Sequence, residues 1–149
     1  MNNRPIGIFD SGVGGLSILK HIHRLLPNED IIYVADSGYA PYGCRGDAYI
    51  EERSRVMTEF LLEKQVKAIV IACNTATASI IEKFRSYYGL PFVGVEPGIK
   101  PALLKSRHQR IGVMATTGTL ASQRYADLMS RFAGQASIIN QPRPGSTTR

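Results

Sequence analysis

Short apolar runs alternate along the chain with segments in which apolar residues recur every three or four positions. The runs have the length of β-strands, and the segments between them have the period of helices. Strands are predicted at residues 6–9, 31–35, 68–72, 92–95, 110–115 and 136–139. This β-α alternation favours an α/β fold with a mainly parallel sheet flanked by helices. The run at 68–72 is fully apolar, which is typical of a central strand.

Each predicted helix should turn one apolar face toward the sheet. The inward positions expected are Leu16, Leu19, His23 and Leu26; Ile50, Met57, Phe60 and Leu61; Ile80, Ile81 and Phe84; Ile99, Leu103 and Leu104; and, in one helix over 119–132, Leu120, Leu128 and Phe132. Asp47 and Asn74 are expected to cap the second and third helices, because short polar side chains suit that position. Pro97 fits the first turn of the fourth helix.

The pattern divides the chain into unequal parts. Residues 1–97 are predicted to form a first α/β domain, and 98–140 the start of a second. Residues 141–149 have no apolar side chain beyond proline and are expected to be an irregular tail. Such an end suits either a short tail on a complete small domain or an interrupted β-α chain.

Composition excludes several classes of protein. The longest apolar run, 68–73, is too short to cross a bilayer, and no signal-peptide stretch follows the N-terminus. The two cysteines cannot build a disulfide framework or a four-thiolate zinc site, and the three histidines lack metal-ligand spacing. We therefore expect a soluble cytoplasmic protein with reduced thiols, no metal and no membrane partner.

The net charge of +6 is unevenly distributed. Residues 98–149 hold eight of the 18 basic residues but only one of the 12 acidic ones. A basic half can bind nucleic acid. Here the basic residues are scattered without aromatic interleaving or a binding motif, which favours a solvated face and no nucleic-acid partner.

Small polar residues follow nearly every predicted strand. In open α/β sheets, ligands bind beyond the carboxyl ends of the strands. The polar groups at these ends are Asp10-Ser11, Asp36 with Tyr42-Gly43, Cys73-Asn74-Thr75, Glu96, and Thr116-Thr117. We expect the functional site at this edge of the sheet.

The glycines that follow the first strand match no nucleotide-binding fingerprint. A GxGxxG motif starting at Gly12 would need glycine where Ser17 stands, and no P-loop occurs. Two interpretations remain for Gly12, Gly14 and Gly15. They let backbone amides approach a small anionic ligand, or they form a tight turn with positive φ.

Cys73 is the strongest candidate for a reactive residue. It ends an apolar strand just before a predicted helix, where the helix dipole favours a thiolate and lowers the thiol pKa. A lone buried cysteine can equally serve as a small core residue. Asp10, at the end of the first strand, could cap a helix or orient or deprotonate a neighbour. Cys44, in a glycine-rich loop, is interpreted as incidental.

Five blocks in register resemble the aspartate/glutamate racemase family. They are Ile6 to Leu16, Asp36 with Pro41-Tyr42-Gly43, Cys73-Asn74-Thr75-Ala76, Val95-Glu96-Pro97, and Ala115-Thr116-Thr117-Gly118-Thr119. Each block alone is weak evidence for the family, but five blocks in this order are specific for it.

The resemblance implies a cofactor-independent racemase that interconverts L- and D-glutamate with two thiols, supplying D-glutamate for peptidoglycan. It implies that Cys73 acts on the D-enantiomer with Asp10 as its carboxylate helper. The substrate binders it implies are Asp10, Ser11, Tyr42, Gly43, Asn74, Thr75, Thr116 and Thr117. A homodimer is one assembly consistent with it.

The chain departs from the family pattern after the fifth block. Family members carry a second catalytic cysteine, whereas no cysteine follows Cys73. The sequence is therefore expected to be a truncated N-terminal portion that lacks the return elements of its first domain. Two other functions stay open: an inactive amino-acid-binding remnant or partner module, and a nucleotide-binding or flavodoxin-like domain, against which the failed motifs count.

Overall fold

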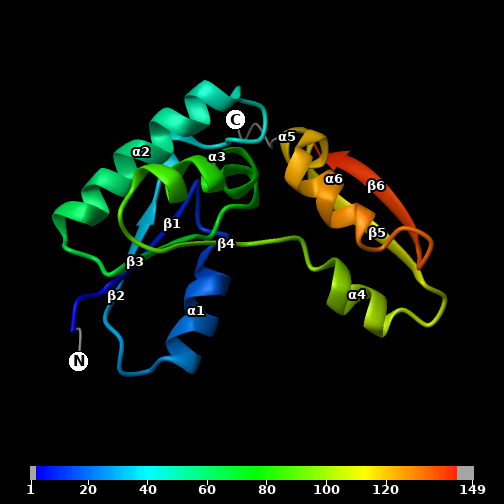
Figure 1. Cartoon of the computed structure of the whole chain (residues 1–149), viewed down its shortest axis with the longest axis horizontal. Helices are drawn as coiled ribbons and strands as arrows, with labels where there is room; N and C mark the ends of the chain where they lie inside the picture. The colour runs from blue at the N-terminus through cyan, green and yellow to red at the C-terminus, as the bar shows by residue number, and fades with distance from the viewer. Residues whose placement is uncertain (1–2, 144–149) are drawn as a thin grey trace.

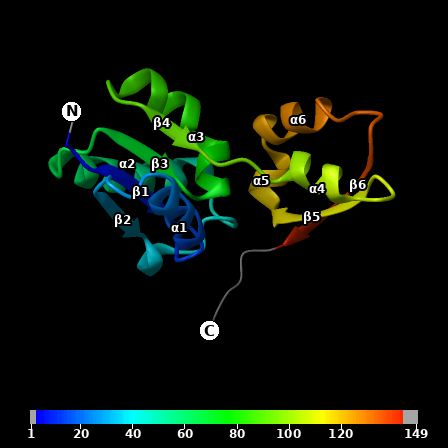
Figure 2. The ribbon, with the colours of Figure 1, turned by 90° about the horizontal axis from the view of Figure 1, so that it is seen from below.

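The computed structural model describes residues 3–143 and has two lobes joined by a single crossing of the chain (Figures 1 and 2). The first lobe holds four strands, β1 (Ile6–Asp10), β2 (Ile31–Ala35), β3 (Ala68–Ile71) and β4 (Phe92–Gly94). Its helices are α1 (Leu16–Leu25), α2 (Asp47–Glu63) and α3 (Asn74–Tyr87), with a one-turn 3-10 helix at Ser37–Tyr39. All strand pairs are parallel, in the order β2-β1-β3-β4. The predicted α/β class, with β3 inside the sheet, is confirmed.

Helices cover both faces of this sheet, with α2 and α3 on one side and α1 on the other (Figure 1). Successive residues of a strand point to opposite faces, so the strands contribute to two cores. Phe9, Ile69 and Ile71 pack with α2 and α3. Ile8 and Val70 pack against α1. Burial on both faces explains why β1 and β3 read as continuous apolar runs.

The second lobe is smaller. It contains α4 (Ile99–Lys105), β5 (Arg110–Thr116), α5 (Thr117–Ala121), α6 (Gln123–Ser130) and β6 (Ser137–Arg143). The strands β5 and β6 form a parallel pair. A separate core of four buried side chains holds this lobe together: Ile99, Val113, Tyr125 and Leu128.

Several expected inward positions are wrong. Leu16, Leu26 and Phe60 are between 42% and 47% exposed, Leu104 is 80% exposed, and His23 is exposed as well. α1 packs through Leu19, as expected, and through Ile18 and Ile22. α2 buries two small polar residues, Ser54 and Thr58, beside Ile50, Met57 and Leu61. The spacing of apolar residues is compatible with burial of either of two neighbouring helix faces. The element that packs against the helix decides which face is buried.

The predicted helix over 119–132 is two helices. The chain leaves helical geometry at Ser122, whose hydroxyl donates to the Thr119 carbonyl and accepts from the Tyr125 N–H. Ser122 therefore ends α5 and caps α6, as a serine at an N-cap does. β6 continues through Gln141, Pro142 and Arg143, so the prediction of an irregular tail is wrong for these residues; the rest of it lies outside the described residues.

The expected caps are shifted by one residue. Gly46, without a side-chain cap, precedes α2, and Asp47 is the first helical residue. Cys73, not Asn74, caps α3. Among residues 3–143, no helix is both long and apolar enough to span a membrane.

Candidate active site

The parallel pairing of β1 with β2 and β3 brings three strand ends to one edge of the sheet. Asp10 ends β1, Asp36 follows β2, and Cys73 lies two residues beyond β3. Asp10 and Cys73 line the same cavity, and Ser11 Oγ lies 3.4 Å from Cys73 Sγ. The structure thus brings together residues that are more than 60 positions apart in the sequence.

Backbone amides hold the Asp10 carboxylate in place. The Ser11 N–H donates to Oδ1 and the Gly15 N–H donates to Oδ2, each at 2.8 Å. A Cβ on Gly15 would lie 2.8 Å from the Ala72 Cβ and 2.9 Å from the Asp10 Cβ, so only glycine fits there. The chain does turn at residues 11–15, but among the described glycines only Gly134 has positive φ, so the turn does not use the positive φ that was expected. Gly15 permits close approach, and the anion that its amide meets is Asp10 itself.

Cys73 is held in a defined orientation at the start of α3. Its Sγ accepts a hydrogen bond from the Ala76 N–H at 3.4 Å, and the side chain is 7% exposed. Burial raises the pKa of the Cys73 thiol, and the Asp10 charge adds to the rise, although hydrogen bonds from Ser11 and Ala76 oppose it. The expected lowering of this pKa is wrong, because desolvation of the thiolate outweighs the helix N-terminus.

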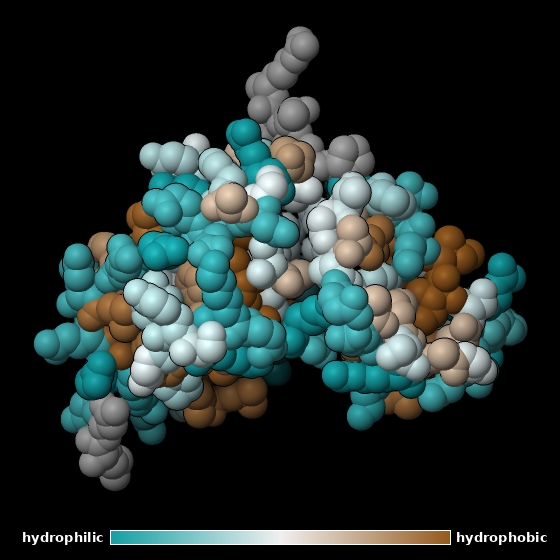
Figure 3. Space-filling view, turned by 45° about the horizontal axis from the view of Figure 1, so that its top comes forward, coloured by the Kyte–Doolittle hydropathy of each residue, from teal (hydrophilic) through white to brown (hydrophobic). Residues whose placement is uncertain are grey.

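A cavity of about 610 Å³ opens beside these residues, between the lobes. The first lobe contributes Asp10, Cys73, Asn74 and Thr75, and the second contributes residues of α4, β5 and α5. The volume lies in the usual range of small-molecule sites. Figure 3 shows the two lobes as adjacent masses with largely hydrophilic surfaces.

Three hydroxyls meet where the lobes touch. Thr75 Oγ1 lies 3.1 Å from Thr116 Oγ1 and 3.4 Å from Thr119 Oγ1, and the last two lie 3.0 Å apart. All three residues line the cavity. Hydroxyl groups both donate and accept, so this cluster can bind a carboxylate or an ammonium group.

The remaining predicted residues differ in their placement. Asn74 is exposed and lines the cavity. Tyr42 is 2% exposed and directs its hydroxyl to Asp36, and neither Tyr42 nor Gly43 is among the residues that line the cavity. Gly43 packs so closely on the second lobe that a Cβ there would lie 2.4 Å from Thr116 Cγ2. Thr117 is exposed at the start of α5.

Cys44 stands apart from this arrangement. It is exposed, and its thiol donates to the Pro41 carbonyl at 3.8 Å. Cys73 is therefore the one cysteine of the chain that lines the cavity. Among residues 3–143, no group of three or more His, Cys, Asp or Glu side chains could hold a metal ion.

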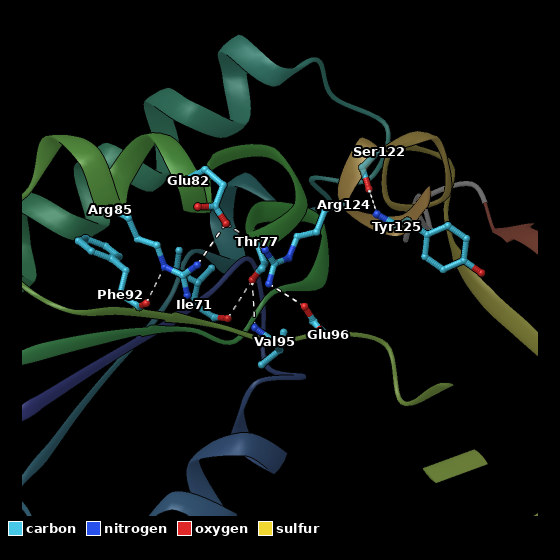
Figure 4. Close-up of polar contacts among 10 residues, drawn as sticks. All are labelled: Ile71, Thr77, Glu82, Arg85, Phe92, Val95, Glu96, Ser122, Arg124 and Tyr125. Carbon is cyan, nitrogen blue, oxygen red and sulfur yellow. Dashed lines mark hydrogen bonds and ion pairs between the residues drawn. The ribbon is translucent and has the colours of Figure 1, made fainter. Parts of the chain in front are cut away.

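The sequence placed Thr119 in a family block without a site role, and it did not single out Arg53 or Arg124. Arg124 of α6 donates to Glu82 of α3 at 3.1 Å and to Glu96 at 2.8 Å, which links the two lobes (Figure 4). Arg53 of α2 forms a two-pronged ion pair with Asp36. Their partners lie 17 to 42 positions away in the sequence, so no local spacing marks these arginines.

Comparisons with known proteins show that this chain is similar to glutamate racemases in sequence and fold. The glutamate racemase of Ectopseudomonas mendocina is 54% identical over 142 residues, which are 95% of this chain and 54% of that protein. The Escherichia coli glutamate racemase solved with L-glutamate superposes with a TM-score of 0.84 at 37% identity, over 93% of this chain and 53% of that one.

The Francisella tularensis glutamate racemase solved with D-glutamate has a TM-score of 0.75 at 37% identity, over 95% and 53% of the two chains. The chain thus spans about half the length of the relatives it matches. The family pattern described as Asp/Glu/Hydantoin racemase matches residues 6–145. The chain therefore belongs to the Asp/Glu/Hydantoin racemase family.

Proposed function

We propose that this chain carries one half of a glutamate racemase site and removes the α-proton of D-glutamate with Cys73. The observation that supports this most directly is a buried thiol in contact with Ser11, beside a fixed carboxylate, on a cavity of suitable size. The relatives are glutamate racemases, two of them solved with L- or D-glutamate. In a cell, the role that the family resemblance implies is the supply of D-glutamate for peptidoglycan.

The proposed step needs no cofactor. Cys73 must first lose its proton. The thiolate then takes the α-proton, the C–H bond breaks, an S–H bond forms, and the electron pair stays on the substrate. Donors fixed in a site with little water stabilise that charge without reorganising. We propose that Asp10 orients the ammonium group, and that Ser11, Asn74, Thr75, Thr116, Thr117 and the Tyr42-Gly43 backbone hold the substrate.

Inversion requires a second base on the opposite face of the α-carbon. Within residues 3–143, no second thiol lines the cavity. We therefore expect the 149-residue chain to exchange the α-proton with solvent and return it to the same face, so that the substrate remains D-glutamate.

The test is incubation of D-glutamate with the chain in deuterated buffer. NMR measures loss of the α-proton signal, and circular dichroism measures inversion. We expect slow exchange with retained configuration in wild type and in Cys44→Ala, and no exchange in Cys73→Ser. Exchange that survives in Cys73→Ser would contradict the proposal, and so would inversion by the chain alone.

A second candidate is a module that binds glutamate without turnover. It is favoured by the burial of Cys73, which is 7% exposed: burial disfavours the thiolate and raises the pKa of the thiol. Calorimetric binding of glutamate without any Cys73-dependent exchange up to pH 9.5 would support this function over the racemase half-reaction.

A further inference from the structure

A buried ion pair lies just outside the cavity, in a part of the first lobe that the proposed chemistry does not use. Arg53 Nη2 donates to Asp36 Oδ1 at 2.7 Å, and Arg53 Nε donates to Asp36 Oδ2 at 2.9 Å. The same Oδ2 accepts the Tyr42 hydroxyl at 2.7 Å. Asp36 is only 8% exposed. Its two oxygens therefore receive three donors in fixed directions, a geometry that a planar guanidinium provides and an ammonium does not.

This pair ties the 36–46 loop to α2. Besides holding Asp36, the Arg53 guanidinium stacks over the Tyr39 ring at 3.5 Å from its centroid. The Tyr42 ring packs edge-on against Tyr49, also on α2. The start and the middle of the loop thus rest on one helix, and Arg53 contacts the part that leaves β2.

The loop in turn contacts the candidate active site. Tyr42 belongs to the same buried cluster as Cys73. Gly43 follows it directly and packs against Thr116, which lies 3.1 Å from Thr75 on the cavity wall. A displacement of the Tyr42-Gly43 turn would therefore reach both the thiol and the hydroxyl cluster.

We propose that Arg53 is a positioning residue: it orients Asp36, and through Asp36 it holds the Tyr42-Gly43 turn in place beside Cys73 and Thr116. The effect on substrate binding rests on the proposed function, because that function assigns the turn to the substrate. Burial alone would raise the pKa of Asp36, but the hydrogen bonds from Arg53 and Tyr42 hold it below its usual value. The carboxylate is thus charged, and its orientation depends on its donors.

Arg55 provides a matched control. It lies two residues from Arg53 on the same helix, and its guanidinium, on a side chain that is 40% exposed, pairs with Glu51 at 3.0 Å and has no contact with Asp36. Methionine at either position keeps much of the aliphatic stem and removes the charge. An effect of Arg53→Met that Arg55→Met lacks is therefore specific to Asp36 and the turn.

The first measurement does not depend on glutamate. The Tyr39 N–H donates to the Asp36 carbonyl and the Arg45 N–H to the Tyr42 carbonyl, so both amides report on the loop. We expect Arg53→Met to speed hydrogen exchange at these amides about tenfold or more, and Arg55→Met to change it less than about twofold. Equal exchange rates in the two variants would overturn the proposal.

The double variant Asp36→Asn/Arg53→Met separates orientation from charge balance. In this variant no buried carboxylate lacks a cationic partner, and the side-chain amide oxygen at position 36 can still accept the Tyr42 hydroxyl. If Arg53 only neutralised Asp36, the double variant would regain wild-type amide protection, which would overturn the proposal. We expect the Tyr39 and Arg45 amides of the double variant to exchange as fast as they do in Arg53→Met. If Arg53→Met does not fold, the double variant and Arg53→Lys make the same comparison with Arg55→Met.

The second measurement uses α-proton exchange of D-glutamate. We expect Arg53→Met to raise KM about tenfold while kcat changes less than about threefold, because a misplaced turn weakens binding more than it alters the thiol. Arg55→Met should change neither. A wild-type chain without binding or exchange would refute the proposed function, while the amide exchange would still decide the role of Arg53. If wild type is active and KM stays unchanged in Arg53→Met, the link to the site is wrong.

Discussion

At the scale of single residues, the thiol pKa of Cys73 is subject to opposing effects. The position at the start of α3 and the contacts with Ser11 and Ala76 favour the thiolate, while burial and the nearby Asp10 carboxylate favour the thiol. Burial has the larger effect, so the pKa rises. A thiol of this kind is unreactive by default and acts as a base only when its environment favours the charge.

The first prediction is that alkylation of Cys73 by iodoacetamide will still accelerate as pH rises above about 8.5, the ordinary thiol value. The reactive form is the thiolate, and a raised pKa moves its formation to higher pH. Ser11→Ala should shift the profile further upward, because the Ser11 contact favours the thiolate. Mass spectrometry of the Cys73 peptide over pH 6 to 10.5 measures the profile. A rate that levels off near pH 7 would contradict it.

At the scale of elements, the site depends on a close fit between the loop before α2 and the start of α5. Gly43 has no room for a side chain, because Thr116 occupies the space that a Cβ would need. Thr116 is itself fixed as the cap of α5, where its Oγ1 accepts from the Thr119 N–H at 3.2 Å. Gly43 therefore cannot move without displacing the loop before α2, and Thr116 cannot move without disturbing the start of α5.

The second prediction concerns Gly43→Ala. A new Cβ at 2.4 Å from Thr116 Cγ2 must force the loop or α5 to move, so we expect a loss of about 1–3 kcal/mol in the free energy of unfolding. Gly38→Ala is the matched control in the same loop, since nothing lies within 4 Å of its Cβ position. It should change stability by less than about 0.5 kcal/mol. Urea titration compares the two, and equal stabilities would show that the close approach is absent in solution.

At the scale of the whole molecule, the lobes have separate cores and meet through α3, α5 and α6. The Thr75, Thr116 and Thr119 hydroxyls lie on one part of this contact, and the ion pairs of Arg124 with Glu82 and Glu96 lie on another. The cavity lies beside this contact, between the lobes. Its width therefore depends on how firmly α6 is held to α3.

The third prediction is that Arg124→Met loosens the lobes. Glu82 is 73% exposed and Glu96 39%, so solvent screens both pairs, and we expect a loss of about 1 kcal/mol or less. The difference from wild type should shrink in 1 M salt, where the Debye length falls to about 3 Å. Urea unfolding at low and high salt measures this. Arg131→Met, in the same lobe, is the control, since none of the ion pairs found among residues 3–143 involves Arg131. A salt-independent loss would mean that the packing of the Arg124 stem, and not its charge, joins the lobes.

Local sequence determined most of the secondary structure of this protein. Short apolar runs such as 68–72 are typical of strands within a covered sheet, and the β-α order favours parallel pairing. Asp10 and Cys73 were foreseeable as neighbours, because parallel strands place their carboxyl ends on one edge. Five short blocks in register were enough to indicate the family.

Tertiary structure alone decided everything that depends on distant partners. Helix period could not tell Leu16 or Phe60 from the residues that pack, because the neighbouring element selects the face. The Cys73 pKa follows from burial, which depends on the whole core and not on the cap position. Arg53, Thr119 and Arg124 gain their roles from groups 17 to 44 positions away. The site is formed by contacts between elements, and no local pattern encodes such contacts.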